Sequence, residues 1–218
     1  MSSCRVRPVA PPLPDSGARL LHPLVVAASR GALPEWAKAR ENRRRHMARV
    51  SALLGDWANA RGEAPQEVMR WMAAGHLHDA LRDEDQEVLR GKLAPPFQGL
   101  PGKVLHGPGV AQRLREEGVE DEELLHAIAF HTLGSPAFGP LGMALYAADF
   151  LEPGRILREE WRSELRRRAP GDLEGVVREI LSARIGYLVG EMRPLHPETV
   201  AFWNRLSEGE TWASASEI

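Results

Sequence analysis

The chain has 218 residues, of which 43% are hydrophobic and 27% are charged, and its formal net charge at pH 7 is -2. This is the composition of an ordinary soluble domain, and the small net charge excludes a general attraction to nucleic acids or acidic membranes. The single cysteine, Cys4, excludes an intramolecular disulfide, and no apolar run approaches the length of a membrane span. We therefore expect a cytoplasmic protein without a membrane partner.

Residues 1–18 are rich in proline and small polar residues. Such a segment buries little apolar surface, so we predict a disordered tail. Residues 19–208 are predicted to form one domain, and residues 209–218 a flexible C-terminal tail.

Helical periodicity begins near residue 20, and proline, glycine and aspartate mark the helix boundaries. A short helix is predicted over residues 21–29, and a longer one over residues 34–60. In the longer helix, His46, Val50 and Leu53 share one apolar stripe. His46 is therefore expected to face inward.

The next predicted helix begins at Pro65 and ends at the pair His78 and Asp79. Adjacent helical residues point about 100 degrees apart around the axis. Both side chains can therefore reach one site only near the end of the helix. Asp83 and Gln86 are predicted to cap a short helix that follows.

Residues 93–102 are predicted to be an irregular rim or lid, because prolines and glycines interrupt them. His106 then stands directly before a Gly-Pro pair, where a helix can begin. Asp121 is predicted to cap the following helix, whose inward stripe ends at His131.

A further helix is predicted to begin at Pro140, and Asp149 continues its apolar face. The last helices are predicted over residues 158–169, over residues 172–191 and from Pro197 onward. No segment alternates with a period of two between hairpin turns. The predicted fold class is therefore all-α.

Imidazoles and carboxylates recur near the ends of these helices, and several of them continue an apolar stripe. A buried carboxylate needs a cationic partner, and ligands without a thiolate suit iron, manganese, nickel or zinc. Two divalent ions would fit if Asp79 bridged them. For Asp149 taken alone, a salt bridge to arginine is an equal alternative. The predicted ligands are His46, His78, Asp79, His106, His131 and Asp149.

The remaining histidines lie off these stripes and are predicted to be structural: His22, His76, His126 and His196. The basic runs at residues 43–45 and 166–168 are predicted to be solvated helix faces. Because no aromatic residues interleave with them, we expect no nucleic-acid partner. The sequence also contains neither a phosphate-binding Walker loop nor a nucleophile elbow.

Four strings follow His46 in the order GHLHD (residues 75–79), LHG (105–107), AIAFHT (127–132) and ADFLEPGR (148–155). Over about residues 35–190, this series resembles the YqeK family of HD-domain phosphohydrolases. The resemblance implies a helical HD domain with its metal site between helices. It also implies a dinuclear iron-type centre and symmetrical hydrolysis of diadenosine tetraphosphate to two molecules of ADP.

On this resemblance, one ion would be held by His46, His78, Asp79 and Asp149, and the other by Asp79, His106 and His131. Two such ions would lower the pKa of a shared water and supply the attacking hydroxide. Asp79 and Arg82 are the predicted catalytic residues. The predicted phosphate contacts are Arg82, Lys103, Thr132 and Arg155.

Alternatives stay open for several of these roles. Lys103 is equally well explained as a solvated loop residue, Thr132 as a helix cap, and Arg155 as a partner of Asp149 or Glu152. The substrate could be another nucleotide, such as a nucleoside monophosphate or a guanosine polyphosphate. A regulatory HD domain that binds nucleotide without turnover is a further alternative. A homodimer is also open, with Trp203 and Trp212 as candidate contacts.

Overall fold

The computed structural model describes residues 20–155 and 157–208, and every regular element in these ranges is a helix. The all-α prediction is confirmed. The tails predicted for residues 1–18 and 209–218 lie outside the described residues. In the part of the chain that the structure describes, no helix is both long enough and apolar enough to cross a membrane.

The helices follow in the order α1 (Pro23–Ser29), α2 (Glu41–Ala60), α3 (Pro65–Leu77), α4 (Gln86–Lys92), α5 (Pro95–Gln98), η1 (Gly102–Val104), α6 (His106–Glu116), α7 (Glu122–Phe130), α8 (Pro140–Leu151), α9 (Glu159–Arg168), α10 (Leu173–Gly190) and α11 (Pro197–Ser207). Proline begins α1, α3, α5, α8 and α11. This position suits proline, because the first N–H of a helix has no partner within the helix. Asp121 caps α7, as predicted, by accepting a hydrogen bond from the Leu124 amide at 3.1 Å.

The prediction of a long helix from residue 34 is wrong for residues 34–40, because α2 begins only at Glu41. The preceding segment instead pairs with the chain beyond α3. The Lys38 amide donates to the Ala80 carbonyl at 2.6 Å, and the Lys38 carbonyl accepts from the Asp83 amide at 3.0 Å. These long-range bonds replace the local ones of a helix.

The predicted cap of α4 is also wrong. Asp85 caps this helix, accepting from the amides of Glu87 and Val88 at 2.9 and 3.0 Å. The Asp83 carboxylate accepts instead from the Arg40 amide at 2.8 Å. The rim predicted to be irregular contains the short helix α5, and η1 begins at its last residue, Gly102.

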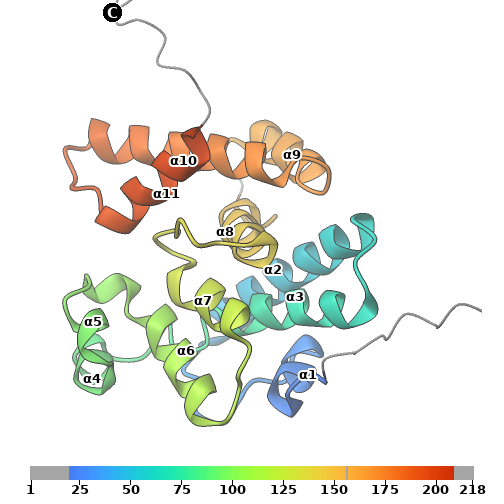
Figure 1. Ribbon diagram of the computed structural model, residues 1–218, viewed down its shortest axis with the longest axis vertical. Coiled ribbons are helices and arrows are strands. Elements are labelled where there is room, and N and C mark those ends of the chain that lie inside the picture. Colours follow the sequence, from blue (N-terminus) through green and yellow to red (C-terminus); the bar gives the residue numbers. More distant parts are fainter. Residues whose placement is uncertain (1–19, 156, 209–218) are drawn as a thin grey trace, which may run out of the picture.

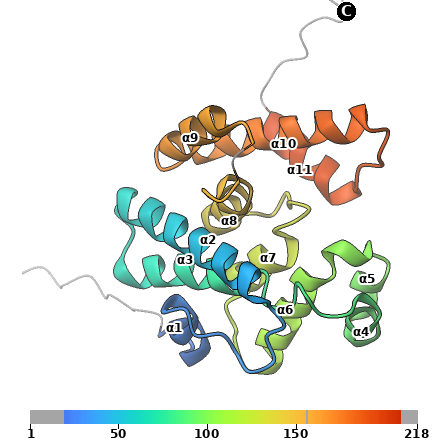
Figure 2. The same ribbon diagram turned by 180° about the vertical axis from the view of Figure 1, so that it is seen from behind.

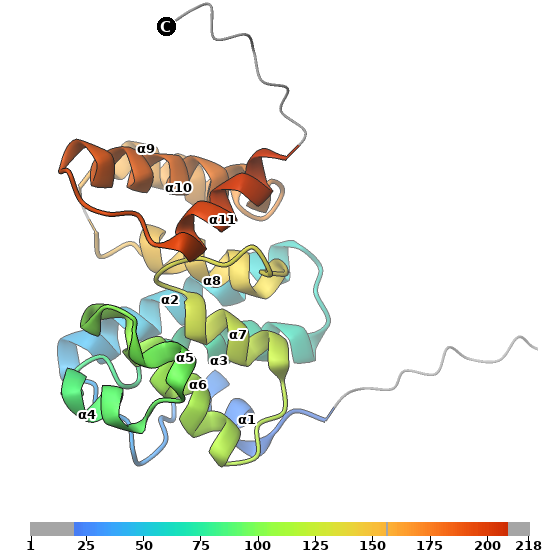
Figure 3. The same cartoon turned by 60° about the vertical axis from the view of Figure 1, so that its left-hand side comes forward.

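Helix α8 occupies the centre of the molecule (Figure 1), where it contacts α2, α3, α7 and α10. Its sequence is apolar on all sides, and nine of its twelve residues are buried. A helix of this kind is stable only when other helices surround it. Helices α9, α10 and α11 form a layer on one side of α8, and the earlier helices lie on the other (Figures 2 and 3).

Aromatic rings join this layer to α8. The Phe202 ring of α11 packs edge-on against Phe138 and Tyr146, with centroid distances of 5.3 and 5.6 Å. Trp203, a predicted dimer contact, is half-buried and packs against the same core. Trp212 lies outside the described residues, so the homodimer stays a prediction.

Candidate metal centre

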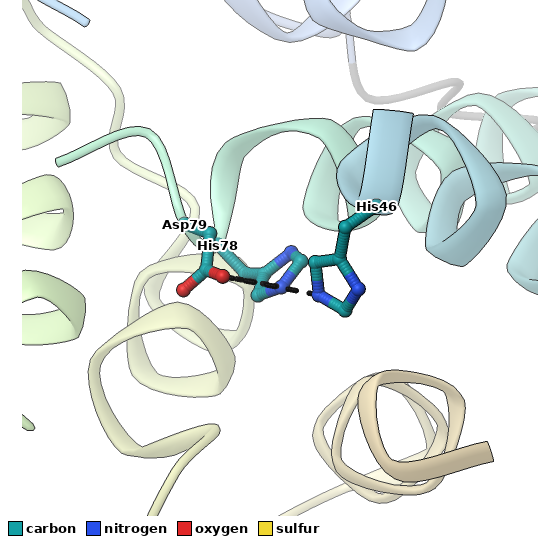
Figure 4. Close-up of side chains that lie close together, drawn as sticks. All are labelled: His46, His78 and Asp79. Atoms are coloured by element: carbon teal, nitrogen blue, oxygen red, sulfur yellow. Dashed lines mark ion pairs between the residues drawn. The ribbon is translucent and has the colours of Figure 1, made fainter. Parts of the chain in front are cut away.

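The residues predicted as ligands come together beside α8. Their positions are α2 for His46, the end of α3 for His78 and Asp79, the start of α6 for His106, the end of α7 for His131, and the last turns of α8 for Asp149. Four of these positions are at helix ends, where a side chain can turn toward the common centre. Figure 4 shows three of the side chains converging from α2 and α3.

His78 and His131 are oriented in the same way. Each follows the last residue of its helix, and its Nδ1 lies 2.8 Å from a carbonyl three residues earlier, that of Gly75 or Ile128. A carbonyl only accepts, so Nδ1 carries the hydrogen in both rings. Each Nε2 therefore presents its lone pair to the cluster, as in histidines that bind metals.

Asp79 lies between two pairs of histidines. Its Oδ1 is 2.9 Å from His106 Nε2 and 3.6 Å from His131 Nε2. Its Oδ2 is 3.6 Å from His78 Nε2 and 3.8 Å from His46 Nε2 (Figure 4). The carboxylate therefore belongs to two groups that could each hold a metal ion, His46 with His78 and His106 with His131.

Two buried nitrogens indicate that these groups fit a cation. His46 Nε2 and His78 Nε2 are both buried, and neither has a hydrogen-bond partner among the described residues. A buried polar atom without a partner costs about 1–3 kcal/mol. A divalent ion would satisfy both lone pairs, and nitrogen with carboxylate oxygen is a suitable ligand set for first-row metals.

Asp149 lies at the edge of the cluster. Its Oδ1 is 3.1 Å from His46 Nε2, without the alignment of a hydrogen bond, and 3.1 Å from Arg155 Nη2. Asp149 therefore forms the salt bridge to arginine that the sequence left open, and it also lies beside the predicted ligand His46, so its binding of a metal stays a prediction.

Burial and the neighbouring side chains shift the pKa values of the cluster residues. Burial lowers the pKa of His78 to about 4, so that this ring is neutral at pH 7. Burial by itself would raise the pKa of Asp79, but its interactions with His78, His106 and His131 hold it well below its usual value. An anionic Asp79 beside a neutral His78 is the protonation state that a divalent metal requires, whereas Asp79 raises the pKa of His131 despite the burial of that ring.

Arg43 contradicts the prediction that residues 43–45 form a solvated helix face. Its Nη1 donates to Asp79 Oδ2 at 2.7 Å, and 28% of its side chain is exposed, against 66% for Arg45. Arg43 precedes His46 by three residues and therefore shares its face of α2. That spacing was the signal in the sequence for this contact. Arg166 also departs from the prediction, because it donates to the Leu151 carbonyl at 2.8 Å.

The predicted phosphate contacts lie around the same cluster. Arg82 Nη1 is 3.3 Å from His106 Nδ1 and donates to the Lys103 carbonyl at 2.7 Å. Thr132 Oγ1 is 3.1 Å from His131 Nε2. Arg155 contacts Asp149, as described above, and Lys103 is exposed. Their binding of substrate stays a prediction.

The other histidines have local contacts. His22 and His196 cap α1 and α11 by accepting amide hydrogens at 3.2 and 3.3 Å. His126 Nε2 lies 2.8 Å from Ser135 Oγ, and His76 Nδ1 lies 3.3 Å from the Met72 carbonyl. These contacts account for all four without a metal.

Known proteins resemble this chain in sequence and in fold. The HD domain family matches residues 43–163, which include every residue of the cluster. This chain belongs to the HD-domain family. A protein of Halalkalibacterium halodurans named "Bis(5'-nucleosyl)-tetraphosphatase, symmetrical" is 33% identical over 76% of this chain and 89% of its own length. A Bacillus subtilis protein of the same name is 28% identical over 74% of this chain and 77% of its own length.

A solved structure also supports membership of the HD-domain family. It is described as a predicted HD superfamily hydrolase involved in NAD metabolism from Clostridium acetobutylicum. It superposes on this HD-domain protein with a TM-score of 0.66 and 26% identity, covering 76% of this chain and 89% of the other. The resemblance to YqeK-type HD-domain phosphohydrolases is confirmed, and the protein is an HD-superfamily hydrolase.

Proposed function

We propose that this HD-domain hydrolase cleaves diadenosine tetraphosphate symmetrically into two molecules of ADP. The observation that carries the proposal is the match to the Halalkalibacterium halodurans protein, which extends over 89% of that protein and whose name states this activity. The buried cluster of histidines and carboxylates supports it, because phosphoanhydride hydrolysis requires concentrated positive charge near the phosphates.

The reaction consumes one water. The water oxygen bonds to one of the two central phosphorus atoms, the bond from that phosphorus to the central bridging oxygen breaks, and the bridging oxygen leaves with the other ADP. Two divalent ions, for which we propose iron with manganese, nickel or zinc as alternatives, would supply Lewis-acid charge and a water of lowered pKa. We propose His46, His78, Asp79 and Asp149 for one ion and Asp79, His106 and His131 for the other.

Three arginines each contact a different member of the cluster: Arg43 contacts Asp79, Arg82 contacts His106, and Arg155 contacts Asp149. An anionic polyphosphate that approaches the cluster therefore meets a guanidinium group nearby. We propose that all three bind phosphate oxygens and that Arg82 stabilises charge on the departing ADP. Lys103 and Thr132 are proposed to add contacts at the same side as Arg82.

The substrate proposal is tested by product analysis. Anaerobically purified protein, with its metal content measured, is incubated separately with diadenosine tetraphosphate, a nucleoside monophosphate and a guanosine polyphosphate. We expect ADP as the sole product of the first and negligible turnover of the others. ATP with AMP would contradict symmetrical cleavage. Release of nucleoside with phosphate, or of pyrophosphate, would favour another nucleotide. Thermal stabilisation by nucleotide without any product would favour a regulatory domain.

Replacing Arg43 tests whether this arginine binds a phosphate group of the substrate. Because a hydrogen bond to a charged group contributes about 1.5–3 kcal/mol, we expect Arg43→Ala to raise the KM for diadenosine tetraphosphate by roughly tenfold or more. Arg45→Ala is the matched control, since Arg45 pairs only at the surface of the same helix, with Glu41 at 3.4 Å. Equal KM values for the two variants would exclude a phosphate contact by Arg43.

A further inference from the structure

A buried glutamate lies behind His46. Glu152 directly follows α8, is 3% exposed, and places Oε1 3.3 Å from His46 Nδ1. The other ring nitrogen, Nε2, faces Asp79 and Asp149. His46 therefore lies between a carboxylate outside the cluster and the cluster itself.

His46 differs from His78 and His131 in its position and in the kind of partner that its Nδ1 faces. His78 and His131 follow the ends of their helices, where they use backbone carbonyls. His46 lies inside the twenty-residue helix α2, where each nearby carbonyl already accepts from an amide four residues later. The acceptor that faces His46 Nδ1 is instead a side chain from another part of the chain, the Glu152 carboxylate.

Glu152 is itself held in place by two donors. Its Oε2 accepts from Arg49 Nε at 2.6 Å and from the Gly154 amide at 2.8 Å. A Cβ on residue 154 would lie 2.5 Å from Arg49 Nη2, so the guanidinium group passes through space that only glycine leaves open. With Oε2 used in this way, Oε1 is the oxygen that faces His46.

We propose that Glu152 is a positioning residue that holds His46 as the tautomer with hydrogen on Nδ1, so that the Nε2 lone pair faces the metal site. The proposal rests on the metal-binding role proposed above for His46. A carboxylate accepts hydrogen bonds and donates none, which selects this tautomer in a neutral ring. The Glu and Gly of the string EPGR thereby have a physical role, with Arg49 as their partner on α2.

The substitution Glu152→Gln gives the sharpest test. Arg49 and Gly154 both donate, so they require the amide oxygen of the new side chain, and its NH₂ group then faces His46 Nδ1. An NH₂ group donates to Nδ1 and moves the ring hydrogen to Nε2. The substitution should therefore reverse the tautomer, whereas Glu152→Asp keeps a carboxylate and should retain it.

Nitrogen-15 NMR of the histidine rings shows which nitrogen of His46 carries the hydrogen. The measurement uses the full-length protein after a chelator has removed any bound metal. The His46 signal is assigned by its loss in His46→Gln. We expect hydrogen on Nδ1 in the wild type and in Glu152→Asp, and on Nε2 in Glu152→Gln. In a calorimetric titration with Zn²⁺, Glu152→Gln should weaken one of two sites by about 10–100-fold, the usual effect of losing such a partner.

Glu123→Gln is the matched control. Glu123 also accepts from an arginine, Arg70 Nη2 at 2.8 Å, but belongs to an ion pair between α3 and α7 that does not include His46. This variant should leave the His46 tautomer and both Zn²⁺ affinities unchanged. Circular dichroism of all variants establishes that they are folded.

Two results would overturn the proposal. One is hydrogen on Nε2 of His46 in the chelator-treated wild type, a measurement that requires no variant to fold. The other is a folded Glu152→Gln protein with unchanged tautomer and Zn²⁺ affinity. Neither measurement involves hydrolysis. Failure of the tautomer proposal is therefore distinguishable from failure of the proposed substrate.

Discussion

Replacing Asp79 by asparagine is expected to abolish hydrolysis of diadenosine tetraphosphate and to remove bound metal. Asp79 faces all four histidines of the cluster, with contacts of 2.9 to 3.8 Å through its two oxygens. Asparagine has the same shape but carries no charge, and its NH₂ group cannot bind a cation. Since metal ions contribute several kcal/mol to such reactions, we expect kcat to fall by roughly 1000-fold or more.

The measurements are metal content by elemental analysis and initial rates of ADP formation. His78→Ala is expected to act in the same direction, because it removes a second of the proposed ligands, also drawn in Figure 4. Asp56→Asn, at an exposed position of α2, should change neither quantity. Activity of purified Asp79→Asn in the presence of a chelator would exclude the proposed metal mechanism.

Replacing Gly75 by alanine is expected to destabilise the protein and to disturb the metal site together. A Cβ at this position would lie 2.5 Å from Ser51 Cα and 2.6 Å from the Ser51 amide nitrogen. Both are backbone atoms of α2, so α2 and α3 must move apart. Overpacking of this kind costs typically 1–3 kcal/mol, which corresponds to a Tm lower by about 2–12 °C for a chain of this size.

The same movement separates His46 on α2 from His78 and Asp79 at the end of α3. We therefore expect Gly75→Ala to weaken Zn²⁺ binding, as measured by calorimetry at a temperature where the variant is folded. Gly186→Ala is the matched control, because no atom lies within 4 Å of its new Cβ. It should raise stability by up to about 1 kcal/mol through helix propensity and leave Zn²⁺ affinity unchanged. A Gly75→Ala protein with wild-type Tm and affinity would contradict the close helix crossing.

Several elements could be predicted from the sequence because their signals are local. Pro65, Asp121 and Pro140 mark helix starts through the missing proline N–H or the aspartate cap, and the structure has helices there. The ligand candidates His46 and Asp149 were found because each continues an apolar stripe of its own helix. Periodicity within one helix is sufficient to indicate which face is buried.

Other features depend on which distant segment lies nearby, and local signals do not contain that information. The sequence of residues 34–40 predicts the start of a helix. In the structure, Lys38 forms hydrogen bonds with residues beyond α3 instead, and α2 begins only at Glu41. Arg43 and Arg45 are alike in sequence, but only Arg43 lies on the face of α2 that meets Asp79. The role of Glu152 requires Arg49, which is 103 residues away in the chain.

The sequence by itself determined the helical fold class, most helix boundaries and the set of histidines and aspartates near helix ends. These follow from hydrogen bonds and apolar spacing within single helices. Only the tertiary structure decided that Asp79 lies between two histidine pairs, that Arg43 contacts it and that Glu152 faces His46. Such contacts depend on how α2, α3 and α8 pack, and packing is decided by the shape of the whole core rather than by any one segment.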